Sequence, residues 1–179
     1  MPKGPAARVT DAVMHPLPPV LTGPPALTVV IGMKPAWKGI PLAAGPGLMA
    51  ASISTQASLQ TLETTAKVAE AAALAGAGTP AAPGLVATAT AARLAAEMAK
   101  ASALAANTAS INAAAASGAS IHACVVPWPL PPHGPGVVID GSATVMIENS
   151  PACRLGDTII EAIGPPNKIT MGCPTVIIG

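Results

Sequence analysis

The chain has 179 residues, which leaves room for one domain and one sizeable insertion. Its net charge is +1, from 9 Lys and Arg against 8 Asp and Glu, and this balance excludes the basic surface of a nucleic-acid-binding or membrane-binding protein. Phe and Tyr are absent and only two Trp occur, so a thick core built on aromatic rings is excluded as well.

The sequence divides into three stretches of different composition. Residues 1–45 are rich in Pro, Gly and Val, which is typical of short strands joined by tight turns. Residues 46–118 are dominated by Ala, and residues 119–179 return to the composition of the first stretch. We therefore expect a discontinuous β-domain, formed by residues 1–45 and 119–179, that is interrupted by an insertion.

The insertion is predicted to be a helical hairpin. Ala is the best helix former, and packing residues recur at three-to-four spacing at Leu59, Leu62, Ala66 and Ala69. A cluster of Gly and Pro at 76–84 predicts one turn, with arms at about 48–75 and 85–117. Both arms carry charged residues, and a charge at the centre of a bilayer costs about 2.5–3.5 kcal/mol. The arms are therefore expected to pack on each other or on another protein.

The flanking stretches contain an internal repeat. Thr28–Lys38 (TVVIGMKPAWK) aligns with Thr144–Arg154 (TVMIENSPACR), so that Thr, Val, Ile, Pro, Ala and a cation fall in register. A third copy is split between the chain ends, because Thr175–Gly179 matches its first half and Pro5–Asp11 its second half. We expect the two chain ends to lie side by side and three β-units to share one core on a pseudo-threefold axis.

Several spaced motifs resemble the PAAR family, which is named for the Pro-Ala-Ala-Arg sequence found here at Pro5–Arg8. SPACRLGD at 150–157 and GCPTVIIG at 172–179 also fit the family, whereas the helical middle does not. The resemblance implies a mainly β, conical, pseudo-threefold structure, here with an Ala-rich α-helical hairpin insertion. Its blunt base would sit on a trimeric VgrG-like spike protein and its apex would carry zinc. Such tips serve type VI secretion systems and related extracellular, phage-tail-like injection particles.

The candidate metal ligands lie outside the insertion. The histidines of the chain occur near Pro/Gly-rich turns, and neutral imidazoles suit zinc: His15, His122 and His133. The family pattern resembles three histidines and one cysteine, but the position expected for the cysteine holds Glu161. Cys124 and Glu161 rank level as the fourth ligand of a structural zinc, and Cys173 ranks below them because the repeat places it opposite the metal. The alternative is that the histidines are ordinary solvated turn residues.

Two other repeat positions have predicted roles. Trp37 and Cys153 occupy equivalent positions and are expected to be packing residues. Another position holds a cation in every copy, namely Arg8, Lys38 and Arg154. For these cations, contact with a spike protein, a threefold ring of charge and ordinary solvation all remain open.

The sequence predicts a structural spike-tip protein and not an enzyme, because it has no nucleophile elbow, phosphate-binding loop or paired-carboxylate motif. One alternative is a membrane-interacting translocation effector that uses the hairpin. Another is a zinc hydrolase, if Cys124 and Glu161 both leave the metal open to water.

The N-terminal residues show no signal-peptide pattern, so we expect synthesis in the cytoplasm and assembly at the tip of an injection particle. From there the protein would be delivered outside the cell or into a target cell. The hairpin is expected to contact the spike or an effector cargo. No nucleic-acid partner is expected, and a target membrane would be pierced rather than stably bound.

Overall fold

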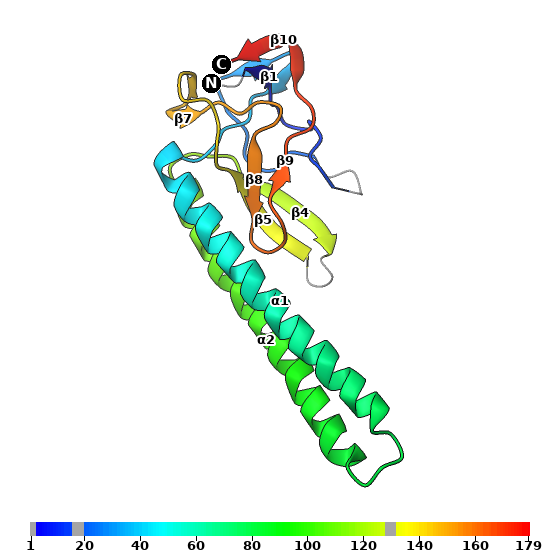
Figure 1. Ribbon diagram of the computed structural model, residues 1–179. Helices are drawn as coiled ribbons and strands as arrows, with labels where there is room; N and C mark the ends of the chain where they lie inside the picture. The colour runs from blue at the N-terminus through cyan, green and yellow to red at the C-terminus, as the bar shows by residue number, and fades with distance from the viewer. Residues whose placement is uncertain (1–2, 16–19, 128–131) are drawn as a thin grey trace.

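A computed structural model describes residues 3–15, 20–127 and 132–179 of the chain (Figure 1). Two long helices, α1 (Gly45–Ala75) and α2 (Ala82–Ala115), form a hairpin that projects from a body of short strands. A short 3₁₀ helix, η1 (Leu42–Ala44), precedes α1. The turn of the hairpin lies far from both chain ends in Figure 1. The fold therefore has a protruding arm and a body that contains the two termini.

The two helices match the predicted hairpin closely, with arms predicted at about 48–75 and 85–117. Pro46 and Pro83 lie in the first turns of the helices, where a missing backbone N–H is tolerated. Between the arms, the buried Lys100 pairs with Glu63, and Arg93 bonds Glu70 at 2.8 Å. These ion pairs fix the register of two Ala-rich surfaces that have few large side chains to interlock. Neither helix of the described chain carries an apolar stretch long enough to cross a bilayer.

The strands of the described residues lie in small sheets. The largest is antiparallel and contains, in spatial order, β4 (His122–Pro127), β5 (Pro132–Val138), β8 (Thr158–Glu161) and β9 (Asn167–Lys168). Three two-stranded antiparallel pairs accompany it: β1 (Gly4–Ala6) with β10 (Cys173–Ile178), β2 (Val30–Ile31) with β3 (Lys34–Pro35), and β6 (Met146–Ile147) with β7 (Ser150–Pro151).

The mainly β class predicted from the sequence is wrong. Helix accounts for 41% and strand for 25%, and the strands lie in small separate sheets. The physical reason is length, because the helices have 31 and 34 residues whereas β2, β3, β6 and β7 have two each. The division into a domain and an insertion stays a prediction. Ile111 of α2 shares one buried cluster with Val137 and Ile160 of the strands, so the base of the hairpin is part of the core.

The three copies of the repeat are joined in a closed ring of backbone hydrogen bonds. The amide of Ala7 donates to the carbonyl of Cys153 (2.8 Å), Cys153 donates to Trp37 (3.1 Å), and Trp37 donates to Ala7 (3.0 Å). A second set of equivalent bonds runs two residues further along, from Val9 to Pro35, Gly39 to Pro151 and Leu155 to Pro5. The split third copy is completed by β1 and β10, in which Gly4 lies opposite Ile178. The predicted meeting of the chain ends is confirmed.

The ring encloses small buried clusters to which all three copies contribute. One contains the equivalent residues Ala6, Ala36 and Ala152, together with Ile31, Ile147 and Ile178. The next contains Ala7, Trp37 and Cys153 from another equivalent position, packed with Val138 and Ile159. Trp37 and Cys153 are fully buried, so their predicted role as packing residues is confirmed. Each copy alone is too small to bury these side chains, and the shared core holds the ring closed.

The hairpins of two copies end in the same kind of turn. Gly32-Met33 joins β2 to β3 and Glu148-Asn149 joins β6 to β7, and all four residues have φ between 50° and 64°. Positive φ at both central residues defines the turn that matches the twist of a two-residue β-hairpin. In the third copy this turn is absent because the two chain ends meet there.

The repeated cations lie in ion pairs within the chain. Arg8 bonds Asp11 at 2.9 Å and Arg154 bonds Asp157 at 3.0 Å, each across three residues. Lys38 instead bonds Glu148 at 2.6 Å. Lys38 and Arg154 are buried, so ordinary solvation is ruled out for these two. Contact with a spike protein stays a prediction.

The Glu148 carboxylate links two copies of the repeat and gives the first testable prediction. Lys38, and the backbone and hydroxyl of Thr28, hold the pKa of Glu148 well below its usual 4.5, at about 2. Because the folded pKa is lowered, this stabilisation is present above the unfolded pKa and is lost as the pH falls through about 2. Between about pH 6 and 8, where neutral histidines can still hold a metal, Glu148→Gln should melt below the wild type by an amount that does not change with pH, because Glu148 stays ionised throughout. A difference that already shrinks between about pH 8 and 6 would contradict the lowered pKa.

Candidate metal centre

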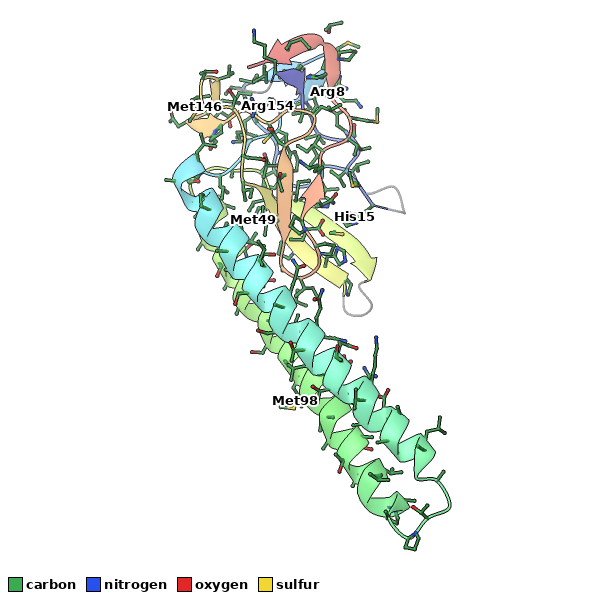
Figure 2. All side chains as sticks on the ribbon, in the orientation of Figure 1. Arg8, His15, Met49, Met98, Met146 and Arg154 are labelled. Atoms are coloured by element: carbon green, nitrogen blue, oxygen red, sulfur yellow. The ribbon has the colours of Figure 1, made fainter. Side chains whose placement is uncertain are left out.

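Four side chains with metal-binding atoms meet near the large sheet. They come from three separate segments, and their ligand atoms all lie within 4.8 Å of one another: His15, His122, Cys124 and Glu161. Figure 2 shows His15 beside β4 and well away from the labelled Arg8 and Arg154. The group is buried except for the partly exposed His15. These residues could hold a metal ion.

The register of the sheet brings three of the four residues together. His122 and Cys124 are two residues apart on β4, so their side chains point to the same face. Gly136 of β5 lies opposite His122 on one side and opposite Glu161 of β8 on the other. A Cβ atom at Gly136 would lie 2.9 Å from Cγ of Glu161. The missing side chain of this glycine therefore opens the space in which the imidazole and the carboxylate meet.

His15 is delivered by the segment that runs beside β9. Val13 forms a β-bridge with Ile169, and the amide of Met14 donates to the carbonyl of Lys168 at 2.8 Å. These bonds end one residue before His15, whose ring then reaches the carboxylate of Glu161. The group therefore joins the N-terminal segment to β4 and β8.

The distances within the group are close to those of a tetrahedral site. Nε2 of His15 and of His122 lie 2.9 and 3.2 Å from Oε1 of Glu161, and Sγ of Cys124 lies 3.4 Å from Nε2 of His15. Bonds of about 2.0–2.3 Å to a tetrahedral ion separate neighbouring ligand atoms by roughly 3.3–3.6 Å. These three separations are equal to or slightly shorter than those around an occupied site, and all the ligand atoms lie within 4.8 Å of one another, so small side-chain movements would admit an ion.

The electrostatics of the group favour a cation. Burial is the largest influence on the pKa of Glu161 and raises it, but contacts with His122, His133 and His15 together hold that pKa below its usual value. Glu161 is therefore an ionised carboxylate that is almost completely removed from water. A buried negative charge of this kind is normally paired with a cation or coordinates a metal.

His122 provides a separate test of whether the group fits a metal. Its ring is fully buried, and among the described residues neither ring nitrogen has a partner with hydrogen-bond geometry. Nε2 lies 3.2 Å from Oε1 of Glu161, which is a favourable electrostatic distance without the alignment of a hydrogen bond. Leaving a buried polar group unsatisfied costs about 1–3 kcal/mol. A metal ion bound to Nε2 would remove part of that cost.

Not every predicted ligand belongs to this group of four side chains. Cys124 and Glu161, the level-ranked alternatives for the fourth ligand, both belong to the group. His133 lies outside this group of four: its Nδ1 contacts Oε2 of Glu161 at 2.6 Å, whereas His15 and His122 lie near Oε1. Cys173 lies in β10, which pairs with β1 at the chain ends, as the repeat predicted.

One neighbour of the site was not predicted from the sequence. The buried Asn167 of β9 donates from Nδ2 to Oε1 of Glu161 at 3.3 Å. An asparagine in a Pro-Pro-Asn segment reads as a turn residue, so the sequence carried no signal for this contact. Asn167 and His133 hold the Glu161 carboxylate from two directions.

Comparison with known proteins gives no relative for this chain, because no family, curated protein or solved structure matches it.

Proposed function

We propose that this protein is a PAAR-like spike tip, which caps a trimeric VgrG-like spike protein of a contractile injection system and is held together by a structural zinc ion. The observation that carries this proposal is the closed ring in which Ala7, Trp37 and Cys153 bond one another in turn. One chain thereby presents three near-equivalent units around one axis. Such an object can dock on a trimer through three similar contacts, which match the threefold symmetry of a cyclic trimer.

An apolar side chain is exposed at the same position of every copy. Val30, Met146 and Ile177 have 65%, 55% and 57% of their surface exposed, whereas the residue that follows each of them is a buried isoleucine. Because they hold equivalent positions in the ring, these side chains would gather on one face around its axis, and an apolar patch on one face is typical of an interaction surface. We call these three residues the apolar triad. The triad supplies the contacts that a threefold spike would cover.

The metal group supports a structural role for the ion. Structural zinc takes four nitrogen, sulfur or oxygen ligands from the protein, and a catalytic zinc keeps one position for water. His15, His122, Cys124 and Glu161 would hold the ion and supply all four ligands. The zinc would cross-link the N-terminal segment, β4 and β8. The hydrolase alternative requires Cys124 and Glu161 to stay away from the metal, and their place in the group does not favour it.

The hairpin adds a single arm to a threefold body. In the proposed assembly the arm would lie along one side of the spike or hold an effector cargo, and the protein would be carried with the tip to the target. Complete removal of residues 46–118 is a poor test of this role, because Ile111 and Ala115 are buried against Val137 and Ile160.

Co-purification tests the docking proposal. The tagged, metal-loaded full chain should retain the trimeric spike protein encoded in the same genome, through a wash that removes unrelated proteins. If a folded and metal-loaded chain retains no spike protein, the proposed function is wrong.

Met33 allows stability and docking to be separated. It lies at the tip of the β2–β3 turn with φ 63° and 93% of its surface exposed. This backbone conformation costs a residue with a Cβ about 1–2 kcal/mol, which glycine does not incur. In the proposed assembly the tip of this turn lies on the docking face, in the same β2–β3 hairpin as Val30. Met33→Gly should therefore keep or raise the melting temperature and still weaken binding to the spike. Met98→Ala, which removes an exposed methionine from the hairpin, is the control and should change neither the melting temperature nor binding to the spike. Equal binding by the two variants would contradict a role for Met33 in docking.

A further inference from the structure

The helical hairpin makes polar contacts with the loop next to the metal group. Nε2 of Gln56, from α1, donates to the carbonyl of Gly164 at 2.5 Å. Nδ2 of Asn107, from α2, donates to the carbonyl of Ala162 at 2.6 Å. One amide from each helix therefore holds the same loop, at carbonyls that are two residues apart.

The same loop lies against His133. The amide of Ile163 donates to the carbonyl of His133 at 3.1 Å. Gly164 has φ +99°, and a Cβ atom there would lie 3.0 Å from Cε1 and Nε2 of the His133 ring. The backbone of Gly164 therefore packs directly on the imidazole. A shift of this loop changes the space available to the His133 ring.

His133 in turn holds the Glu161 carboxylate. Its Nδ1 contacts Oε2 at 2.6 Å, and this leaves Oε1 directed to His15 and His122. Partners of a metal-binding carboxylate fix its orientation, and their loss typically lowers metal affinity 10- to 100-fold.

The amide contacts are not replaced by dense packing at this place. A cavity of about 240 Å³ lies between the helices and β8, and its lining includes Ser52, Asn107, Ile111 and Glu161. Since protein side chains do not fill the space behind Glu161, apolar packing between the hairpin and the loop is limited here. The hydrogen bonds from Gln56 and Asn107 therefore set the distance between the hairpin and the loop.

We propose that Gln56 and Asn107 are positioning residues of the metal centre, which act through the 162–164 loop and His133 on Glu161. This inference rests on the proposed metal site. The orientation of the hairpin and the affinity for metal would then be coupled. A contact that stabilises the metal-bound arrangement of the hairpin raises the affinity for metal, and bound metal strengthens that contact in return. A spike or cargo that held the arm in this position would thereby retain the metal.

The test uses the full chain and compares two double variants. Gln56→Met with Asn107→Leu removes both amides and keeps apolar volume of similar size. Gln60→Met with Asn112→Leu changes exposed residues of the same helices and is the matched control. Affinity is measured by competition with a chelator for Zn²⁺, and the geometry of the site by the visible absorption of bound Co²⁺.

The first double variant should bind Zn²⁺ about 10-fold more weakly and show an altered Co²⁺ spectrum, while the control matches the wild type. The thiolate-to-cobalt absorption from Cys124 should persist, since that ligand is not changed. Wild-type affinity and spectrum in a variant with normal helix content would overturn the inference. A wild type that binds neither ion would instead refute the metal site itself.

A measurement on the wild type keeps the inference falsifiable if the variant does not fold. Addition of Zn²⁺ should slow backbone hydrogen exchange in α1 around Ser52–Gln56 and in α2 around Leu104–Asn107 relative to the distal hairpin. Exchange that slows in the strands alone, with both helix bases unchanged, would overturn it.

Discussion

Removal of the metal is expected to lower the melting temperature by about 20–40 °C. Structural zinc contributes on the order of 10 kcal/mol to folding, and a chain of this length loses about 2–4 °C per kcal/mol. Total stabilities of domains are about 5–15 kcal/mol, so the metal-free chain is expected to be marginal or unfolded. The local reason is that His122 and Glu161 would keep a buried imidazole and a buried charge without the ion that joins them. Thermal unfolding with and without a chelator measures the effect.

Two cysteines serve as a matched pair for this experiment. Cys124→Ser should reduce metal affinity and lower the melting temperature, because it removes one of the four proposed ligands. Cys173→Ser changes a buried cysteine at the other end of the body and should leave the metal content as it is. If the chelator leaves the melting temperature unchanged and the purified protein contains no metal, the zinc proposal is wrong.

Charged substitution of the apolar triad is expected to abolish docking on the spike while the fold is retained. In the triple variant Val30→Asp, Met146→Asp, Ile177→Asp, three carboxylates would be buried without partners at the interface. If burial of each carboxylate costs about 1.4 kcal/mol, the three together lower the affinity for the spike about 1,000-fold. The melting temperature should change little, since all three side chains are exposed in the free chain.

The hairpin provides the control for this variant. Val68→Asp, Leu94→Asp and Met98→Asp change side chains of similar exposure on the arm. This control should bind the spike as the wild type does, or lose only a minor part of its affinity if the arm touches the side of the spike. Loss of binding in the control together with normal binding by the triad variant would mean that docking uses the arm and not the apolar triad.

The sequence predicted the ring and the hairpin because both follow from local patterns. Pro5, Pro35 and Pro151 begin equivalent segments, and equivalent segments form equivalent backbone bonds. Ala-rich arms broken once by Gly and Pro leave few options other than two helices. The overall class was wrong because the repeat does not fix strand length. Of the β-branched run Thr28–Ile31, only Val30 and Ile31 form a strand.

The metal group could be predicted only in part. His15 and His122 were expected, and Cys124 and Glu161 were offered as alternatives although both are present. The position of His133 outside the group could not be predicted. It depends on the strand register that places Gly136 between His122 and Glu161, and this register joins residues far apart in the sequence. Gln56 and Asn107 gave no signal, because an amide in an Ala-rich helix is an ordinary surface residue until the packing partner is known.

The stoichiometry of the complex tests the central claim most directly. Native mass spectrometry of the metal-loaded chain mixed with the trimeric spike protein should give one copy of the chain, with one zinc ion, on each spike trimer. A complex with three copies per trimer, or no complex between two folded proteins, would contradict an account in which a single chain supplies all three units of the tip.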